Sequence, residues 1–250
     1  MNMQQLITTF QPISLDEMKG IRLMNRIDTK FITTTPMLLQ LLNMASQEYF
    51  VQEINGNRNM LYRTVYYDTE RMDMYNAHQH GHANRQKMRY RTYVDSNLQF
   101  LEVKTKNNHG RTKKKRIQAV DQTLNDEKLA FLQETLHYDV FSLRPTLENE
   151  FHRITLVNHN RTERVTLDTD LRYHHILSGQ ERAMNPLVII ELKRDGLCTS
   201  PILGMLRQLH IHPHGFSKYC MGAVLTDPTL PVNLFKPKLR DVERLVNSIL

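Results

Sequence analysis

Charged residues recur at every second position in several stretches of this 250-residue sequence. Side chains two positions apart on a β-strand point to the same face of a sheet. Guanidinium and ammonium groups collected on one face would bind a phosphate-rich anion, arginine through bidentate hydrogen bonds and lysine as a point charge. The same-face sets are Arg89 with Arg91, Glu102 with Lys104, Lys114 with Arg116, Arg164 with Thr166 and Asp168, and Glu191 with Lys193.

The cations on this expected face outnumber the acidic residues. A solvated face explains any single strand, but an ordinary wet face interleaves the two signs, because like charges opposite one another are destabilising. The strands taken together therefore favour a site for a polyanion. Closing about eight strands into a barrel would point the charges inward and form a tunnel. The cations are Arg89, Arg91, Lys104, Lys114, Arg116, Arg153, Arg164 and Lys193, against Glu102, Asp168 and Glu191.

The elements that must position these residues are mostly strands. Short turns at 95–97 and 107–110 predict antiparallel hairpins, and no linker divides the chain, so we expect one α+β domain over residues 1–250 with helices packed outside the sheet. Strands are predicted at about 29–35, 60–67, 87–94, 98–106, 112–119, 149–157, 163–168 and 187–193. Helices are predicted after Pro36, after Asn125 or Asp126, after Pro201, over 217–225 and over 238–250.

Composition excludes several classes of protein. The net charge of +7 favours an anionic partner. The first residues lack the pattern of a secretory signal, and no stretch reaches the roughly 18 apolar residues of a membrane helix, so we expect a cytoplasmic protein with no membrane segment in this chain. Cys198 and Cys220 lack the spacing of a zinc site, so we expect them to be reduced thiols that pack within the fold. No P-loop, Rossmann or nucleophile-elbow motif is present.

Two other patterns have simpler explanations. The basic run Lys113 to Arg116 fits a strand better than a nucleic-acid patch, and no nucleic-acid-binding motif accompanies it, so we expect no nucleic-acid partner. Two groups of alternating histidines could bind a transition metal, but solvated loop histidines are the favoured interpretation. These groups are His78, His80 and His82, and His210, His212 and His214.

Taken in order, the motifs resemble the VTC domain, the catalytic domain of the vacuolar transporter chaperone polyphosphate polymerase. This domain belongs to the triphosphate tunnel metalloenzyme, or CYTH-like, superfamily. The likeness runs from about residue 10 to 227, and the ordered set is more specific than any one motif. The motifs are Arg26-Ile-Asp-Thr-Lys30-Phe, Tyr67-Asp-Thr, Arg89-Tyr-Arg91, Leu101-Glu-Val-Lys104, Lys114-Lys-Arg116, Phe151-His-Arg153, Arg164-Val-Thr-Leu-Asp168-Thr, Ile190-Glu-Leu-Lys193 and Phe216-Ser-Lys218-Tyr.

The resemblance implies a tunnel of eight antiparallel strands that makes inorganic polyphosphate from the γ-phosphate of ATP, with the growing chain threading the tunnel. It implies a divalent cofactor, Mn²⁺ or Mg²⁺. The matching phosphate-contacting residues are Lys30, Arg89, Arg91, Lys104, Lys114, Arg153 and Lys218, with Glu191 as the residue associated with the metal. Further phosphate-binding candidates are Arg26, Arg116, Arg164, Lys193 and Ser217; Glu102 is as well explained by an ion pair as by metal ligation.

Departures from the relatives leave three functions open. The ExExK signature of the tripolyphosphatase and adenylate-cyclase branch is absent near the start, which favours the VTC branch. Regulatory and membrane parts of the relatives are not found in this sequence, so a membrane or regulatory protein partner is expected to supply them. The open functions are a polyphosphate polymerase, a metal-dependent hydrolase of triphosphate or nucleoside triphosphate, and a noncatalytic polyphosphate binder.

Overall fold

The computed structural model describes residues 2–21, 26–108 and 112–247. The helices are α1 (Met3–Thr8), α2 (Leu15–Lys19), α3 (Thr35–Ala45), α4 (Asp73–Gln79), α5 (Asp126–Thr135), α6 (Pro201–Gln208), α7 (Lys218–Thr226) and α8 (Lys236–Asn247), with short 3-10 turns η1 (Val94–Ser96), η2 (Val140–Ser142) and η3 (Asn233–Phe235). The strands are β1 (Gln11–Ser14), β2 (Arg26–Thr34), β3 (Tyr49–Glu53), β4 (Met60–Thr69), β5 (Arg85–Tyr93), β6 (Leu98–Lys106), β7 (Thr112–Ala119), β8 (Leu143–Asn158), β9 (Glu163–His175), β10 (Glu181–Ala183) and β11 (Leu187–Asp195).

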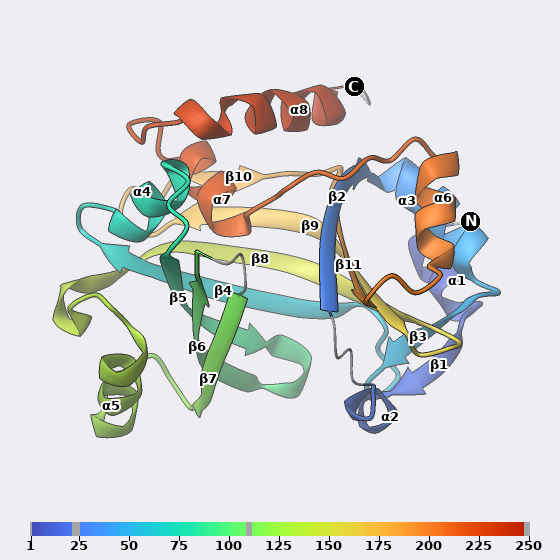
Figure 1. The fold of residues 1–250 in the computed structure, drawn as a ribbon, viewed down its shortest axis with the longest axis horizontal. Coiled ribbons are helices and arrows are strands. Elements are labelled where there is room, and N and C mark those ends of the chain that lie inside the picture. Colours follow the sequence, from blue (N-terminus) through green and yellow to red (C-terminus); the bar gives the residue numbers. More distant parts are fainter. Residues whose placement is uncertain (1, 22–25, 109–111, 248–250) are drawn as a thin grey trace.

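Eight strands form the main path of one curled sheet, in the order β2-β11-β9-β8-β4-β5-β6-β7. Every neighbouring pair along this path is antiparallel. The path ends at β2 and β7, and no pairing joins these two strands among the described residues. In Figure 1, β2 and β7 stand in front of the long strands β8 and β9, so the sheet curls into a half-barrel around a concave face.

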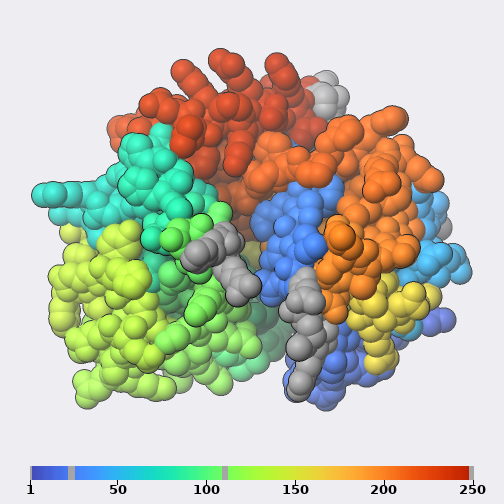
Figure 2. All heavy atoms as spheres, in the orientation of Figure 1, coloured from blue at the N-terminus to red at the C-terminus, as the bar shows by residue number. Residues whose placement is uncertain are grey.

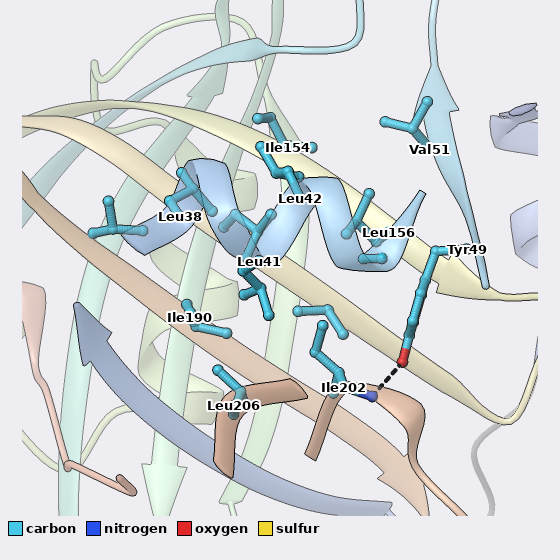
Figure 3. Close-up of a cluster of buried hydrophobic side chains, with 14 of the residues drawn as sticks. Leu38, Leu41, Leu42, Tyr49, Val51, Ile154, Leu156, Ile190, Ile202 and Leu206 are labelled. Carbon is cyan, nitrogen blue, oxygen red and sulfur yellow. Dashed lines mark hydrogen bonds between the residues drawn. The ribbon is translucent and has the colours of Figure 1, made fainter. Parts of the chain in front are cut away.

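The convex face of the sheet carries two hydrophobic cores. Helices α1, α3 and α6 cover β8, β9 and β11 there, and α5 covers β5 to β7. In Figure 3, Leu38, Leu41 and Leu42 of α3 lie over the sheet, and the Ile202 backbone amide donates a 2.9 Å hydrogen bond to the Tyr49 hydroxyl. Burying a leucine side chain fully stabilises the fold by about 2 kcal/mol. This apolar packing holds the strands in register and leaves the concave face to the charged residues.

Helix α7 lies against the concave face instead. Its apolar side chains form a second core with residues of β4, β8 and β9, and α8 lies farther out beyond it. A Cβ atom added to Gly222 would come within 2.4 Å of the Tyr173 ring and 2.7 Å of Leu147. The glycine therefore permits the close approach that lets α7 fill one end of the curled sheet.

The predicted α+β class, the antiparallel sheet of eight strands and the outer helices are confirmed; the sheet curls into a half-barrel, and no pairing among the described residues closes it into the predicted barrel. The strands β8 and β9 are longer than predicted, and α1, α2, α4, β1, β3 and β10 were not predicted. The last predicted helix begins at Lys236, and residues 248–250 of its predicted range lie outside the described residues, as do 109 and 110 of the predicted turn. No helix within the described ranges has the length and apolar character needed to span a bilayer.

Candidate anion-binding site

Glu102 lies at the centre of the β5–β6–β7 wall. The antiparallel register sets Arg89, Glu102 and Arg116 opposite one another on the concave face. The Arg89 Nε and Nη2 atoms donate to one carboxylate oxygen of Glu102 at 2.8 and 2.6 Å, and Lys114 donates to the other at 2.9 Å. Burial alone would raise the pKa of Glu102, but Arg89, Arg91 and Lys114 together hold it below its usual range. This carboxylate is therefore ionised and shared by two cations.

Asp168 holds a second pair of cations on the β8–β9 wall. Arg153 makes a bidentate contact with its carboxylate at 2.6 and 2.7 Å, and Lys218 at the start of α7 donates to the same group. Burial opposes ionisation of Asp168, yet Arg153 and Lys218 lower its pKa to about 2. Burial lowers the pKa of Lys218 to about 8. The phenyl ring of Phe151 lies 4.2 Å from the Lys218 ammonium and completes this cluster.

Glu191 forms the third cluster, on the β2–β11 wall. The register sets Lys30 and Thr166 opposite it on the two neighbouring strands. Lys30 donates to one carboxylate oxygen, and Lys193 donates to the other at 2.7 Å. Burial would raise the pKa of Glu191, but Lys193 and Lys30 keep it well below its usual range. The buried Thr166 hydroxyl has no hydrogen-bond partner among the described residues, which leaves a polar group available beside this carboxylate.

Arg91 and Lys104 lack a carboxylate partner among the described residues. Arg91 donates to the Thr64 hydroxyl at 3.3 Å, and burial together with Arg89 and Arg153 lowers its pKa to about 10. Arg89, burial and Arg91 lower the pKa of Lys104 well below its usual value. An anion placed beside these groups would relieve the repulsion among them.

The space-filling view shows where such an anion could enter. Figure 2 shows the surface hollowed between the green segments of β5 to β7 and the blue β2. The three carboxylate clusters come from the walls on either side of this hollow and from the strands behind it. The curled sheet thus collects cations far apart in sequence around one concave space, with more positive than negative charge on the facing side chains.

Most of the predicted site residues lie together in this space. Lys30, Arg89, Arg91, Lys104, Lys114, Arg153, Lys193 and Lys218 all belong to the clusters above or their immediate surroundings. The roles assigned to them remain predictions.

Three further candidates lie at the margins. Arg26 is exposed and pairs with Asp28, at 2.6 Å. Arg116 is exposed and stacks 4.4 Å from the Phe100 ring. Arg164 donates to the Met18 carbonyl at 3.4 Å, and its buried Nε has no acceptor among the residues that the structure describes. These arginines border the concave space without joining a carboxylate cluster.

Lys87 is a cation of the concave face that the sequence analysis missed. It lies on β5 two residues before Arg89, and its ammonium donates to the Ser217 hydroxyl at 2.7 Å. Ser217 also caps α7 by accepting from the Cys220 amide. The same alternation that singled out Arg89 and Arg91 extends to position 87 and could have identified this lysine.

The two residues expected to bind a metal, Glu102 and Glu191, differ in how well their surroundings suit a metal ligand. Both oxygens of Glu102 bind cations of its own wall, which supports the ion-pair interpretation. Within the described ranges no group of three or more His, Cys, Asp or Glu side chains could enclose a metal. Mg²⁺ commonly uses only one or two carboxylates together with substrate phosphates. Both oxygens of Glu191 also bind cations, but Glu191, unlike Glu102, lies beside the Thr166 hydroxyl, which has no hydrogen-bond partner among the described residues; this carboxylate and hydroxyl fit that kind of open oxygen site.

The interpretation of the histidines as solvated loop residues is wrong for His78. His78 lies in α4, and its Nδ1 is 3.1 Å from the Cys220 sulfur. Burial first, and then Lys87, lower the pKa of His78 to about 2, so the imidazole is neutral. His210 and His212 are exposed in a loop, as predicted. Neither cysteine forms a disulfide, but the packing prediction holds only for the buried Cys220, since Cys198 is exposed.

Comparison with known proteins identifies the fold and its family. The sequence matches the family described as VTC domain over residues 25–226. A proposed adenylate cyclase from Bacillus halodurans has the same fold, with a TM-score of 0.52 and 13% identity over 78% of this chain and 96% of that chain. A proposed adenylyl cyclase from Hippeastrum, described as having a dominant triphosphatase activity, gives a TM-score of 0.48 and 18% identity over 82% and 97% of the two chains. No curated protein matches the sequence.

Proposed function

Because the chain belongs to the VTC domain family, we propose that it is a phosphotransferase that moves the γ-phosphate of ATP onto a growing inorganic polyphosphate chain. One observation carries the proposal: three ionised carboxylates on separate walls of the sheet are each shared by two cations. Two further cations, Arg91 and Lys104, have no carboxylate partner among the described residues. Such a surplus of fixed positive charge suits a linear phosphate chain. Membership of the family and the charged concave face support this substrate class.

The chemistry asks the protein mainly for positioning. In phosphoryl transfer the attacking and leaving oxygens lie in line, and charge on the transferred group must be stabilised. A terminal oxygen of the acceptor chain attacks the γ-phosphorus, a new P–O–P bond forms, the bond to the β-phosphate oxygen breaks, and ADP leaves. No side-chain nucleophile takes part. The cations that clamp the phosphates are Arg89, Arg91, Lys104, Lys114 and Arg153.

The clamp is held in place before ligand arrives. Glu102 fixes Arg89 and Lys114, and Asp168 fixes Arg153 and Lys218, so these four side chains lose little further freedom when phosphate binds. Arg91 is braced by the Tyr62 and Phe151 rings, each 5.8 Å from its guanidinium carbon. The carboxylates thus orient the cations and leave donors of each free to point at the ligand.

Glu191 and Thr166 would hold the divalent ion, together with oxygens of the phosphate chain. If Mn²⁺ or Mg²⁺ were bound there, it would supply positive charge to offset that of the phosphates. Lys30 and Lys193 hold Glu191 ionised in the free protein, ready to act as an oxygen ligand.

The proposal is tested by incubating purified protein with ATP and Mn²⁺ and sizing the products on a gel. Long phosphate chains are expected. Release of free phosphate alone would instead identify a hydrolase that positions water with the same residues, and neither product would identify a noncatalytic binder. In a matched arm, Glu191→Gln is expected to lower divalent-dependent turnover at least tenfold while triphosphate binding changes little; unchanged turnover would remove the metal role. Glu134→Gln serves as the charge-matched control, because Glu134 is an exposed carboxylate on the outer helix α5.

A further inference from the structure

Three lysines lie directly opposite one another on the concave face. The antiparallel register pairs Lys87 with Lys104, and Lys104 with Lys114, across β5, β6 and β7. The neighbouring row contains Arg89, Glu102 and Arg116 and lies about 7 Å away, the rise of two residues along a strand. Like charges in directly opposed positions are destabilising, so this row needs a source of negative charge.

The protein supplies little of that charge. Within the described ranges, Lys114 alone in the row contacts a carboxylate, and it shares Glu102 with Arg89. Lys87 bonds to a neutral hydroxyl, that of Ser217, with the Cys220 sulfur 3.8 Å away. One of the three N–H groups of its ammonium is engaged by Ser217, which leaves donors for a ligand.

The side chains that contact the Lys87 ammonium are also neutral. The ring of Tyr219 lies 5.8 Å from its ammonium, and the first turn of α7 contains no acidic residue. The nearby His78 is uncharged, since burial and the charge on Lys87 itself lower its pKa to about 2. The positive charge of Lys87 therefore acts on its surroundings without a compensating carboxylate among the contacts that the described residues make.

We propose that Lys87, with Ser217 and Lys104, forms a phosphate subsite at the α7 end of the arginine clamp. This subsite takes a phosphate group of a linear chain that extends past the groups held by Arg89 and Arg91. Ser217 holds the Lys87 ammonium at the edge of the concave space, where an incoming phosphate oxygen can accept a second hydrogen bond from it. The inference rests on the proposal that the tunnel binds linear phosphate chains, but it does not depend on whether the protein polymerises or hydrolyses them.

The subsite predicts a dependence on ligand length. Calorimetric titration of the whole protein with pyrophosphate, tripolyphosphate and tetrapolyphosphate at constant ionic strength measures the affinity gained per added phosphate. In Lys87→Met the affinity for tetrapolyphosphate is expected to fall about tenfold, the size of one lost charge-assisted hydrogen bond, while pyrophosphate, held by the clamp, changes less than about twofold. Lys87→Arg keeps the charge and is expected to retain most of the gain.

Two controls separate binding from structure. Lys113→Met removes the same charge from the neighbouring strand β7 on its exposed outer side, and is expected to leave all three affinities within about twofold. Thermal unfolding of ligand-free Lys87→Met is expected to stay close to that of the wild type, since the lost hydrogen bond is offset by relief of repulsion from Lys104.

Three results would overturn the subsite. One is an equal affinity of wild type and Lys87→Met for tetrapolyphosphate, and another is an equal loss for all three ligands, which would indicate only a general electrostatic effect. A third is a matching loss in Lys113→Met. If the wild-type protein bound none of the three ligands, the tunnel would not be a phosphate site and the proposed function would fail together with the subsite.

Discussion

Arg153 and Lys218 share the Asp168 carboxylate, but burial acts on the two cations differently. Burial lowers the pKa of both side chains; in Arg153 the attraction of Asp168 outweighs it and raises the pKa above the usual value, whereas Lys218 falls to about 8. The Arg153 guanidinium thus stays charged at any pH the protein experiences, whereas the Lys218 ammonium loses its proton as the pH rises above about 8. Lys218 is therefore the cation of this cluster whose charge changes just above neutral pH.

The affinity for phosphate ligands is expected to depend on pH because the charge of Lys218 does. A lysine is charged below its pKa, so the affinity for tripolyphosphate should fall as pH rises through about 8. Lys218→Arg keeps the charge and should flatten the fall. Isothermal titrations of both proteins from pH 7 to 9.5 measure the difference; titration of the ligand and of Lys104 affects both proteins alike. Parallel pH profiles for wild type and Lys218→Arg would contradict the assignment.

The sequence predicted which residues share a face but not which of them bond. Strand alternation is enough to place Arg89, Arg91 and Lys104 on the concave side. The bonding of Glu102 to Arg89 and Lys114 depends on the register of two hairpins, and that of Asp168 to Lys218 depends on where α7 packs. The alternation also includes Lys87, but its bond to Ser217 could not be predicted, because the two residues lie 130 positions apart in sequence.

Helix α7 couples one end of the sheet to the charged clusters. Its first residue, Lys218, bonds to Asp168, while Tyr219, Cys220 and Met221 pack with the strands behind it. The predicted range of 217–225 agrees with the observed helix to within a residue at each end. Its position on the concave face was not predicted, although buried side chains all around a short helix are typical of one enclosed by other elements.

Gly222→Ala tests this coupling. The added methyl group would overlap the Tyr173 ring and Leu147, and such overpacking costs about 1–3 kcal/mol. We expect a lower free energy of unfolding in urea and, because α7 must move, weaker tripolyphosphate binding. Gly204→Ala in α6 is the matched control: a Cβ there meets nothing within 4 Å, and the better helix propensity of alanine should stabilise the protein by about 0.5–1 kcal/mol. A Gly222→Ala protein as stable and as tight-binding as the wild type would contradict this account of α7.

At the scale of the whole molecule, the cations gathered on the concave face repel one another and destabilise the ligand-free fold. The net charge of +7 is modest, but the clusters concentrate cations in one buried space and leave the acidic residues largely elsewhere. The fold tolerates this arrangement because the apolar cores on the two faces of the sheet supply the stability. A ligand that neutralises the face should stabilise the entire fold.

Tripolyphosphate is therefore expected to raise the melting temperature. At one hundred times the dissociation constant, binding contributes about 2.7 kcal/mol, which corresponds to a rise of about 5–10 °C for a chain of this size. Differential scanning calorimetry measures the rise, with sodium chloride at equal ionic strength as the control. An equal rise with chloride would mean that simple screening accounts for the effect.

The class of the fold and its antiparallel hairpins followed from the sequence, because hairpin turns and strand patterns are local signals. The unpredicted elements depend on distant contacts: β1 pairs in parallel with β3, and α4 begins after Met72 in a left-handed conformation. No short-range pattern marks either feature. The curl of the sheet depends on how all eight strands and the helices outside them pack together.

The sheet path ends at β2 and β7, and these two strands are not paired with each other among the described residues. A closed ring can be entered by a linear polymer only at one of its ends, and it holds that polymer until an end slides out. An open sheet can bind any internal stretch of the polymer and can release it through the open side. For a long phosphate chain, the rate of capture by an open sheet would follow the total length of polymer in solution rather than the number of chain ends, and release would need no sliding.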